Sequence, residues 1–260
     1  MITDFHQLLD AVADFPVRTV AVAVAEKEGI LSAVAEAMRL NVARPLLVGR
    51  RAEIENAARA VDLPLDGVEV IDVADDLAAA AAATRAVREG RADILMKGHI
   101  HTDDFLRAVL DKEHGLRTGT IMSHVFVLET TARGKLTFVT DGAMNIGPDL
   151  PRKADIILNA VYLARCFGIA SPKVGVLAAV EIVNPAMPAT LDAAALSTMQ
   201  ARRQFPDCIV EGPFALDNAV SIEAARLKGL HGDVAGECDI LLTPDIESGN
   251  ILSKSFAFLA

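Results

Sequence analysis

Residues that can bind an anion gather where a predicted strand meets a predicted helix, in the segment MKGHIHTDDFLRAVL at 96–110. The strand ends at Lys97, and Thr102 or Asp103 can cap the helix that follows. Ligands usually bind at such turns in open α/β sheets, and a helix N-terminus presents free N–H groups to an anion. Arg107 lies about one turn inside the helix, and a guanidinium fits a phosphate. The same pattern also suits first-turn acids and a solvated arginine, so both interpretations stay open.

Two histidines in the same segment raise the alternative of a metal site. His99 and His101 are two positions apart and share one face if the strand continues to them. Asp103 and Asp104 follow, but there is no HExxH pattern and the spacing places no third ligand. We therefore predict no metal ion and assign His101 to a polar loop that binds substrate.

A second strand exit lies in TFVTDGAMNIGPDLP at 137–151. A predicted strand ends at Asp141-Gly142, and a turn rich in glycine and proline follows before the next helix. Asp141 and Asn145 can bind substrate, or they can fix the loop through hydrogen bonds from side chain to backbone. Both interpretations stay open at this exit as well.

A third strand exit, CDILLTPDIESGNILSKS at 238–255, carries the densest set of small polar residues. An apolar strand runs into Thr-Pro-Asp, and Ser248, Gly249 and Asn250 follow. Gly249 allows a close backbone approach, and Asn250 can both donate and accept hydrogen bonds. Lys254 can meet an anion. A plain strand-to-helix connection does not need so many small polar groups, so the pattern favours substrate binding.

The other polar patterns are weaker. Glu211 and Asp217 follow a fourth predicted strand, but Asp217 is also a good helix N-cap. There is no GxxxxGK[ST] loop, no GxGxxG after the first strand and no GxSxG elbow, which argues against an NTPase, a Rossmann dehydrogenase and an α/β-hydrolase. Three cysteines lie far apart without a CxxC pair, which favours buried, reduced thiols over a thioester-forming nucleophile: Cys166, Cys208 and Cys238.

The composition indicates a soluble α/β protein. Hydrophobic residues make up 52% and aromatic residues 4% of the 260 residues, which suits an aliphatic core of parallel strands covered by Ala-rich helices. The net charge of -10 argues against nucleic-acid binding, which needs a basic face. The N-terminus lacks the pattern of a signal peptide, and no apolar run approaches the roughly 18–20 residues of a membrane span. We predict a cytoplasmic protein without nucleic-acid or membrane partners.

The elements that must position these residues alternate along the chain. Helical periodicity is found at 4–15, 27–40, 52–61, 75–89, 151–167, 189–204, 217–227 and 247–259. Strand patterns are found at 17–25, 44–49, 68–73, 93–98, 121–129, 135–140, 173–180, 208–211 and 239–242. This order predicts an α/β fold of two lobes, with mostly parallel sheets flanked by helices. The two neighbouring strands joined by TTARGK break the alternation, so we place the first lobe at 1–120 and the second at 121–260.

Four segments together resemble the phosphate acetyltransferase and phosphate butyryltransferase family. The resemblance is strongest to the butyryltransferase-like branch, which includes the transferase part of enoyl-CoA hydratase/phosphate acetyltransferase fusions. The family's patterns His-Thr-x-x-x-Leu-Arg, Asp-x-x-x-Asn, Asp-x-Ala and Pro-Asp-x-x-Ser/Ala-Gly-Asn are matched, in that order, by these positions: His101, Thr102, Leu106 and Arg107; Asp141 and Asn145; Asp217 and Ala219; Pro244, Asp245, Ser248, Gly249 and Asn250. Each pattern is modest alone, but four in the right order are specific.

The resemblance implies two α/β lobes like those of isocitrate and isopropylmalate dehydrogenases, with the active site in the cleft between them. It implies the reversible transfer of a short acyl group, from acetyl to butyryl, between coenzyme A and inorganic phosphate. Acyl-CoA and phosphate are then substrates, no cofactor is needed, and the protein is a homodimer or larger. The family pattern continues past Ala260, where this chain stops inside an apolar helical pattern, with a Ser-Arg pair and a nearby Asp linked to catalysis.

The resemblance also suggests a role for each candidate residue. The catalytic residues are expected to be Arg107, which binds phosphate or acyl phosphate, together with Asp245 and Asn250. The expected substrate-binding residues are Lys97, His101, Thr102, Asp141, Asn145, Ser248, Gly249 and Lys254.

Two other functions fit part of the pattern. A metal- and NAD-dependent dehydrogenase of the same two-lobed fold would use His99, His101 and nearby acids around an ion. A catalytically inactive CoA-binding protein would keep the binding residues without turnover. Metal analysis and an assay of acyl transfer separate these alternatives from the transferase.

Overall fold

The computed structural model describes residues 1–130 and 133–259. The chain divides into two compact units, an N-terminal unit of Asp10–Gly119 and a C-terminal unit of Thr120–Ala260 together with Met1–Leu9. The sequence prediction had placed residues 1–9 in the first lobe. Instead, the Ile2 amide donates to the Phe167 carbonyl at 2.8 Å, and the Phe5 amide donates to Glu129 Oε2 at 2.8 Å. An amphipathic pattern predicts a helix, but it does not say against which core that helix packs.

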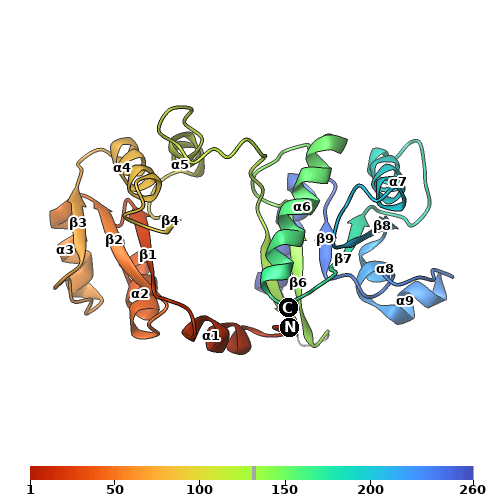
Figure 1. Cartoon of the computed structure of the whole chain (residues 1–260), viewed down its shortest axis with the longest axis horizontal. Helices are drawn as coiled ribbons and strands as arrows, with labels where there is room; N and C mark the ends of the chain where they lie inside the picture. Colours follow the sequence, from red (N-terminus) through yellow and green to blue (C-terminus); the bar gives the residue numbers. More distant parts are fainter. Residues whose placement is uncertain (131–132, 260) are drawn as a thin grey trace. The chain divides into compact units, whose positions relative to one another are not determined.

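The N-terminal unit is a four-stranded parallel sheet in the order β3-β2-β1-β4 (Figure 1). Its strands are β1 (Arg18–Ala23), β2 (Ala43–Gly49), β3 (Glu69–Asp72) and β4 (Ile94–Lys97). Its helices are α2 (Glu28–Arg39), α3 (Arg51–Ala60), α4 (Asp76–Arg88) and α5 (Thr102–Val109). The helix α1 (Phe5–Ala13) begins in the C-terminal unit and ends in the N-terminal unit.

The two faces of this sheet are covered by different helices. Val22 and Leu47 pack with Leu31 of α2 and Ile54 of α3 on one face. On the other face the small side chains of α4 pack against β1 and β2, in a cluster that includes Ala21, Leu46, Ala79 and Ala83. Because alanine brings a helix close to the strands, the Ala-rich pattern of α4 explains its close packing on this side of the sheet.

The C-terminal unit is a five-stranded sheet in the order β5-β6-β9-β7-β8 (Figure 1). Its strands are β5 (Phe126–Thr130), β6 (Lys135–Thr140), β7 (Lys173–Leu177), β8 (Ile209–Phe214) and β9 (Ile240–Leu242). Only the pair of β5 with β6 is antiparallel, and the other neighbours run parallel. Its helices are α6 (Leu150–Cys166), α7 (Pro188–Ala201), α8 (Leu216–Val220), α9 (Ile222–Leu227) and α10 (Ile246–Leu259).

Helices cover both faces of this sheet too. Ile156 and Ile157 of α6 and Leu196 of α7 pack in one cluster with Val174 and Ile240. A second cluster on the opposite face joins α8 and α9 to the strands through residues such as Leu177, Phe214, Ala219, Ala225 and Leu241. The aliphatic core predicted from composition is therefore present in each unit.

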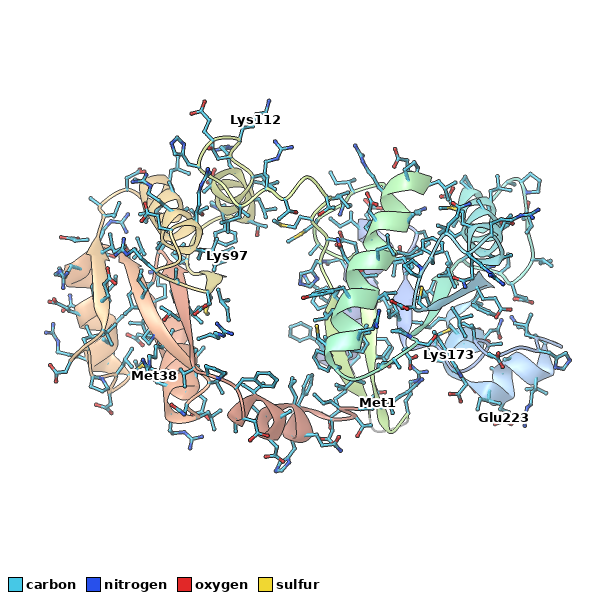
Figure 2. All side chains as sticks on the ribbon, in the orientation of Figure 1. Met1, Met38, Lys97, Lys112, Lys173 and Glu223 are labelled. Atoms are coloured by element: carbon cyan, nitrogen blue, oxygen red, sulfur yellow. The ribbon has the colours of Figure 1, made fainter. Side chains whose placement is uncertain are left out.

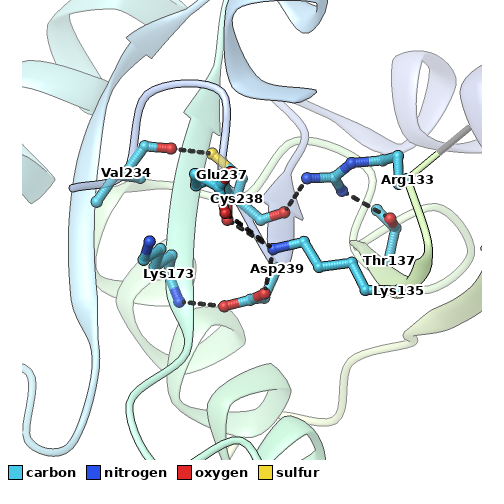
Figure 3. A network of polar contacts seen from close by, with 8 residues as sticks. All are labelled: Arg133, Lys135, Thr137, Lys173, Val234, Glu237, Cys238 and Asp239. Carbon is cyan, nitrogen blue, oxygen red and sulfur yellow. Dashed lines mark hydrogen bonds and ion pairs between the residues drawn. The ribbon is translucent and has the colours of Figure 1, made fainter. Parts of the chain in front are cut away.

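The amino ends of the central strands are tied by a polar network (Figure 3). The Lys135 Nζ donates to Asp239 Oδ1 at 2.6 Å and to the Glu237 carbonyl at 2.8 Å. Asp239 Oδ2 accepts from the Lys173 amide at 2.9 Å. Arg133 donates to the Cys238 carbonyl and to Thr137 Oγ1, each at 2.7 Å. These contacts join the starts of β6, β9 and β7.

The predicted helices and strands are present, with two differences inside the C-terminal unit. The strand predicted at 121–129 begins only at Phe126, because the preceding segment binds side chains instead of a strand. The helix predicted at 217–227 is split by Ser221, whose Oγ accepts from the Ala224 amide at 3.2 Å and starts α9. The TTARGK connection includes residues 131–132, which lie outside the described residues. Among the residues described, no helix is long and apolar enough to cross a membrane.

Candidate functional site

The exit of β6 is organised by one buried carboxylate. Asp141 is 3% exposed, and its Oδ1 accepts from the amides of Ala143 and Met144 at 2.9 and 3.1 Å. Its Oδ2 accepts from the Asn145 amide at 3.2 Å and from Asn145 Nδ2 at 2.6 Å. The sequence left open whether Asp141 binds substrate or fixes the loop. In the structure Asp141 fixes the loop, because both carboxylate oxygens already accept hydrogen bonds from it.

The exit of β9 lies directly against this loop through two glycines. A Cβ on Gly249 would lie 2.7 Å from the Asp141 carbonyl oxygen and 2.6 Å from Thr243 Oγ1. A Cβ on Gly142 would lie 2.8 Å from the Gly249 carbonyl carbon. Asn250 Nδ2 donates to the Gly142 carbonyl at 3.0 Å. The close approach predicted for Gly249 is thus an approach to the neighbouring backbone.

The first turn of α10 is held by Asp245. Its Oδ1 accepts from the Ser248 amide and from Ser248 Oγ, each at 2.8 Å. These hydrogen bonds, first that of the Ser248 amide, lower the pKa of Asp245, and the positive charge of Lys153 adds to the effect. Asp245 is therefore ionised at neutral pH and acts as a helix N-cap.

A segment before β5 crosses the exit of β6. Asn145 Nδ2 donates to the Met122 carbonyl at 3.0 Å, and Thr140 Oγ1 donates to the His124 carbonyl at 2.8 Å. Asn159 Nδ2 of α6 donates to the Ile121 carbonyl at 3.0 Å. Beside this segment lies an open hollow of about 710 Å³ whose lining includes apolar and polar side chains: Ile121, Met144, Asn145, Ile146 and Arg152.

The anion-binding segment predicted in the N-terminal unit lies at the exit of β4, next to that of β1. The chain runs outward from β1 to β3 and returns to β4 on the other side, which makes the β1–β4 edge the topological switch point. The Gly98 amide donates to the Ala23 carbonyl at 2.8 Å, and a Cβ on Gly98 would lie 2.3 Å from that oxygen. The segment is therefore pressed against the neighbouring strand exit.

The charged residues of this segment are exposed and locally paired. Lys97, at the end of β4 (Figure 2), donates from Nζ to the Ile100 carbonyl at 2.7 Å. The Arg107 side chain is 70% exposed and pairs with Asp104 at 2.9 Å. α5 begins at Thr102, so His101 occupies the N-cap position and its side chain makes no capping bond. The cap predicted at Thr102 or Asp103 is wrong by one or two residues.

Sequence reasoning missed a charged network at the same edge of the N-terminal unit. The Glu26 side chain is 4% exposed, and its carboxylate accepts from the Arg50 amide at 2.7 Å and from Arg50 Nη1 at 2.6 Å. Arg50 Nη2 donates to Asp76 Oδ1 at 2.6 Å. The signal was present in the sequence, because acidic and basic residues directly follow the first two strands.

The cysteines do not supply a nucleophile at these strand ends. Burial raises the pKa of Cys208 to about 11 and that of Cys238 to about 12. Both thiols are therefore protonated at neutral pH, whereas the reactive form is the thiolate. Cys166 is exposed at the end of α6. Among residues 1–130 and 133–259 no cluster of three or more His, Cys, Asp or Glu has the geometry to hold a metal ion.

The predicted residues fall into two groups. The exits of β6 and β9 bring together Asp141, Asn145, Ser248, Gly249, Asn250 and Asp245 within the C-terminal unit. Lys254 lies farther along α10 and is exposed. The exit of β4 and α5 carry Lys97, His101, Thr102 and Arg107 in the N-terminal unit.

Comparisons with known proteins show what the whole chain is similar to. Residues 76–260 match the family model described as phosphate acetyl/butaryl transferase. The chain is 44% identical over 260 residues to a phosphate butyryltransferase of Clostridium beijerinckii, covering all of this chain and 86% of the relative. It is 44% identical over 232 residues to a phosphate acetyltransferase of Rhizobium meliloti, covering 89% of this chain and 73% of that one.

Solved structures give the same grouping. A branched-chain phosphotransacylase from Enterococcus faecalis superposes with a TM-score of 0.81 at 32% identity, covering 94% of this chain and 85% of that one. A phosphotransacetylase from Streptococcus pyogenes superposes with a TM-score of 0.80 at 21% identity, covering 97% and 85%. Because the identity is only 21%, the second match supports the fold alone.

Proposed function

The chain belongs to the phosphate acetyl/butaryl transferase family, and from this membership we propose which of its residues carry the reaction. It is a phosphate acyltransferase, which moves a short acyl group between coenzyme A and inorganic phosphate. The observation that carries this function is the 44% identity to a phosphate butyryltransferase over the whole chain. The dehydrogenase alternative is not favoured by the family model or the relatives.

Arg107 is proposed to bind the phosphate, or the phosphoryl group of the acyl phosphate. Its guanidinium is exposed and pairs only with Asp104, three positions earlier on the same helix, among the described residues. Such a surface pair contributes little, so a doubly charged phosphate can replace the single carboxylate at small cost. The N-terminus of α5, with His101 and Thr102, and the neighbouring Lys97 are proposed to complete the anion site.

The exits of β6 and β9 are proposed to bind the reacting groups through Asn145, Ser248, Gly249, Asn250 and Lys254. Asp141 and Asp245 are proposed to hold these residues in place without contacting the substrate. Their carboxylates already accept hydrogen bonds from backbone and side-chain donors of their own loops. In the direction of acyl-CoA formation, the thiol of coenzyme A loses its proton and its sulfur attacks the acyl carbonyl. Phosphate then leaves, and fixed donors stabilise the charge that develops on the carbonyl oxygen.

Further properties are proposed on the same basis. We expect acyl groups from acetyl to butyryl, because the relatives include a phosphate butyryltransferase and a phosphate acetyltransferase. Coenzyme A is a substrate, and the chemistry calls for no cofactor. We also propose a cytoplasmic homodimer or larger assembly, and a two-lobed arrangement like that of isocitrate and isopropylmalate dehydrogenases.

The function is tested by incubating the protein with acetyl-CoA, propionyl-CoA or butyryl-CoA plus phosphate while free thiol is followed. Thiol release that depends on phosphate is expected, and its absence with all three substrates would end the proposal.

Arg107→Ala is expected to raise the KM for phosphate at least about ten-fold, because the variant loses a charge-assisted pair with the phosphate.

Arg59→Ala is the matched control, because Arg59 is also exposed and also donates to a residue three positions earlier, Asn56. Its kinetics should equal those of the wild type. If Arg107→Ala behaves like the control, Arg107 does not bind phosphate.

A further inference from the structure

One peptide group at the exit of β1 is turned against the pattern of its sheet. Val24 follows the last residue of β1 and has a φ of 58°, in the left-handed region where a β-branched residue is an outlier. The Ala23 carbonyl accepts from the Gly98 amide of the β4 exit at 2.8 Å. Because successive carbonyls of a regular strand point to opposite neighbours, the Val24 carbonyl should point to β2. Instead it accepts from the His99 amide, at the same β4 exit, at 2.9 Å.

The two adjacent acceptors fix the turn that precedes α5. A Cβ on Gly98 would lie 2.3 Å from the carbonyl oxygens of Val24 and of the residue before it, so this approach requires glycine. Ile100, which follows His99, is 9% exposed and packs in the same core cluster as Val24. α5 begins three residues after His99. The turned peptide therefore determines where the N-terminus of α5 starts from the sheet.

The left-handed conformation of Val24 is held from both sides. A residue in a sparsely populated conformation persists only where its surroundings determine that conformation, and such residues cluster at functional sites. The Val24 side chain is 1% exposed in the core. The next amide, that of Ala25, donates to the Val48 carbonyl of β2 at 3.1 Å. The carboxylate of Glu26, one residue further, accepts from the amide of Arg50 at the exit of β2 at 2.7 Å.

Arg50 joins the exits of β1 and β2 to a helix. Its Nη1 donates to Glu26 Oε2 and its Nη2 to Asp76 Oδ1 at the start of α4, each at 2.6 Å. A Cβ on Gly49 would lie 2.8 Å from Glu26 Oε1, so glycine lets the carboxylate reach the backbone of β2. The Glu26 side chain is 4% exposed, and burying a charge is costly even when it is paired. A tie between two strands that served stability alone would not need a buried charge.

We propose that Glu26 is a positioning residue for the phosphate site: held by Arg50, it keeps the Val24 peptide turned toward the exit of β4. The inference rests on the phosphate-binding role proposed for Arg107 and the N-terminus of α5. It adds that the exits of β1 and β2, which carry none of the residues proposed to bind substrate, determine where that site lies.

Glu26→Gln tests the inference, because glutamine keeps the shape of the side chain and loses the charge-assisted bonds to Arg50. With the tie weakened, the Val24 peptide can return to an extended conformation and withdraw its carbonyl from His99. The KM for phosphate is expected to rise roughly ten-fold, since a misplacement of about 1 Å can cost about a hundred-fold. The KM for acyl-CoA should equal that of the wild type, because the reacting groups are proposed to bind at the exits of β6 and β9. A loss of stability alone would move neither KM of the folded enzyme.

A double variant connects the effect to the phosphate site. In an Arg107→Ala background, Glu26→Gln should raise the KM for phosphate much less than in the wild type, because the group that it positions is gone. An undiminished rise would overturn the link to this site. If Glu26→Gln does not fold, Arg50→Met removes the same tie from a side chain that is 36% exposed, and the same change in the KM for phosphate alone is expected.

The control matched in its hydrogen bonds lies at the opposite end of the same sheet. Asp93 also accepts from a strand amide, that of Thr19 at 2.8 Å, and from an arginine, Arg18 Nη1 at 3.1 Å. Asp93→Asn should leave the KM for phosphate unchanged. A folded Glu26→Gln variant with the wild-type KM for phosphate would overturn the inference, and so would an equal rise in Asp93→Asn. A wild-type protein without phosphate-dependent acyl transfer would instead overturn the proposed function.

Discussion

The two ends of the five-stranded sheet in the C-terminal unit are built in different ways. At the amino end, long charged side chains join the strand starts: Lys135 binds Asp239, and Arg133 binds the Cys238 carbonyl (Figure 3). At the carboxyl end, backbone meets backbone, because a Cβ on Gly142 or Gly249 would clash with the other exit. The strands are joined by charged side chains at the amino end. At the carboxyl end they approach closely because glycine has no side chain.

This difference indicates where each end tolerates change. A flexible charged side chain can adjust when its partner is altered, so the expected loss is one of stability. A backbone contact leaves no such freedom, and a shift of the exit moves every polar group that the exit carries. Since misplacement by about 1 Å can lower catalytic rates about a hundred-fold, activity should be the sensitive quantity at the carboxyl end.

The largest effect is expected from Gly249→Ala. The new Cβ would lie 2.6–2.9 Å from Thr243 Oγ1, the Asp141 carbonyl oxygen and Gly142 Cα, so the two exits must move apart. We expect a loss of about 1–3 kcal/mol in the free energy of unfolding and on the order of a hundred-fold in kcat/KM. Denaturant unfolding and steady-state kinetics measure the two quantities.

Gly147→Ala serves as the stability control for this prediction. Gly147 lies in the same exit of β6, and a Cβ there would meet nothing within 4 Å. Its unfolding free energy should stay within about 0.5 kcal/mol of the wild type. If Gly249→Ala keeps full activity, close backbone contact does not set the geometry of this end.

The next effect should fall on stability at the amino end. Asp239→Asn removes the nearer of two charge partners of Lys135, whose side chain is 22% exposed and therefore keeps some contact with water. We expect a loss of about 2 kcal/mol, below the value for fully buried pairs, with kcat and KM unchanged. Chemical denaturation measures the loss. A fall in kcat for the folded variant would contradict the separation of the two ends.

The sequence predicted the strand exits better than the partners of their residues. The exits at Asp141 and at Ser248–Asn250 were found because glycine, proline, asparagine and aspartate mark the ends of strands locally. The pairing of Gly142 with Gly249 was not predictable, because it joins positions 107 residues apart and depends on β9 lying next to β6. Strand order is a long-range property that no local pattern contains.

Buried charges were missed for a related reason. Lys153 falls on the apolar stripe of α6, which could have marked it as buried, but the helical pattern does not name its partner Asp192 on α7. Glu26 and Arg50 directly follow different strands, and they meet only because β1 and β2 are neighbours. Burial can thus be predicted from periodicity, while electrostatic partners require the topology.

A smaller effect is expected from Ser248→Ala. The change removes the hydroxyl that donates to Asp245 Oδ1 but keeps the amide that donates to the same oxygen. We expect a loss of about 1 kcal/mol in unfolding free energy. The loss in kcat/KM should be larger than for Asp239→Asn, since the hydroxyl lies at the proposed site. Equal kinetics for Ser248→Ala and the wild type would place the serine outside the site.

The smallest effect concerns pH and His124, whose carbonyl accepts from Thr140 at the end of β6. Burial lowers the pKa of His124, while the charge of Asp141 opposes this shift. Its Nδ1 is buried and has no hydrogen-bond partner among the described residues. Because the folded pKa lies below the unfolded value of about 6.5, the unfolded chain binds the proton more readily, and stability falls as the pH drops through 6.5 toward the folded pKa. The slope from this one proton is at most about 1.4 kcal/mol per pH unit.

In His124→Gln that contribution is gone, so the unfolding free energy should change less between pH 7.5 and pH 5.5 than in the wild type. Urea titrations at the two pH values would measure the change. Equal changes in both proteins would mean that the carboxyl end carries no acid-sensitive group at this position, and the contrast between the two ends would then lie in geometry alone.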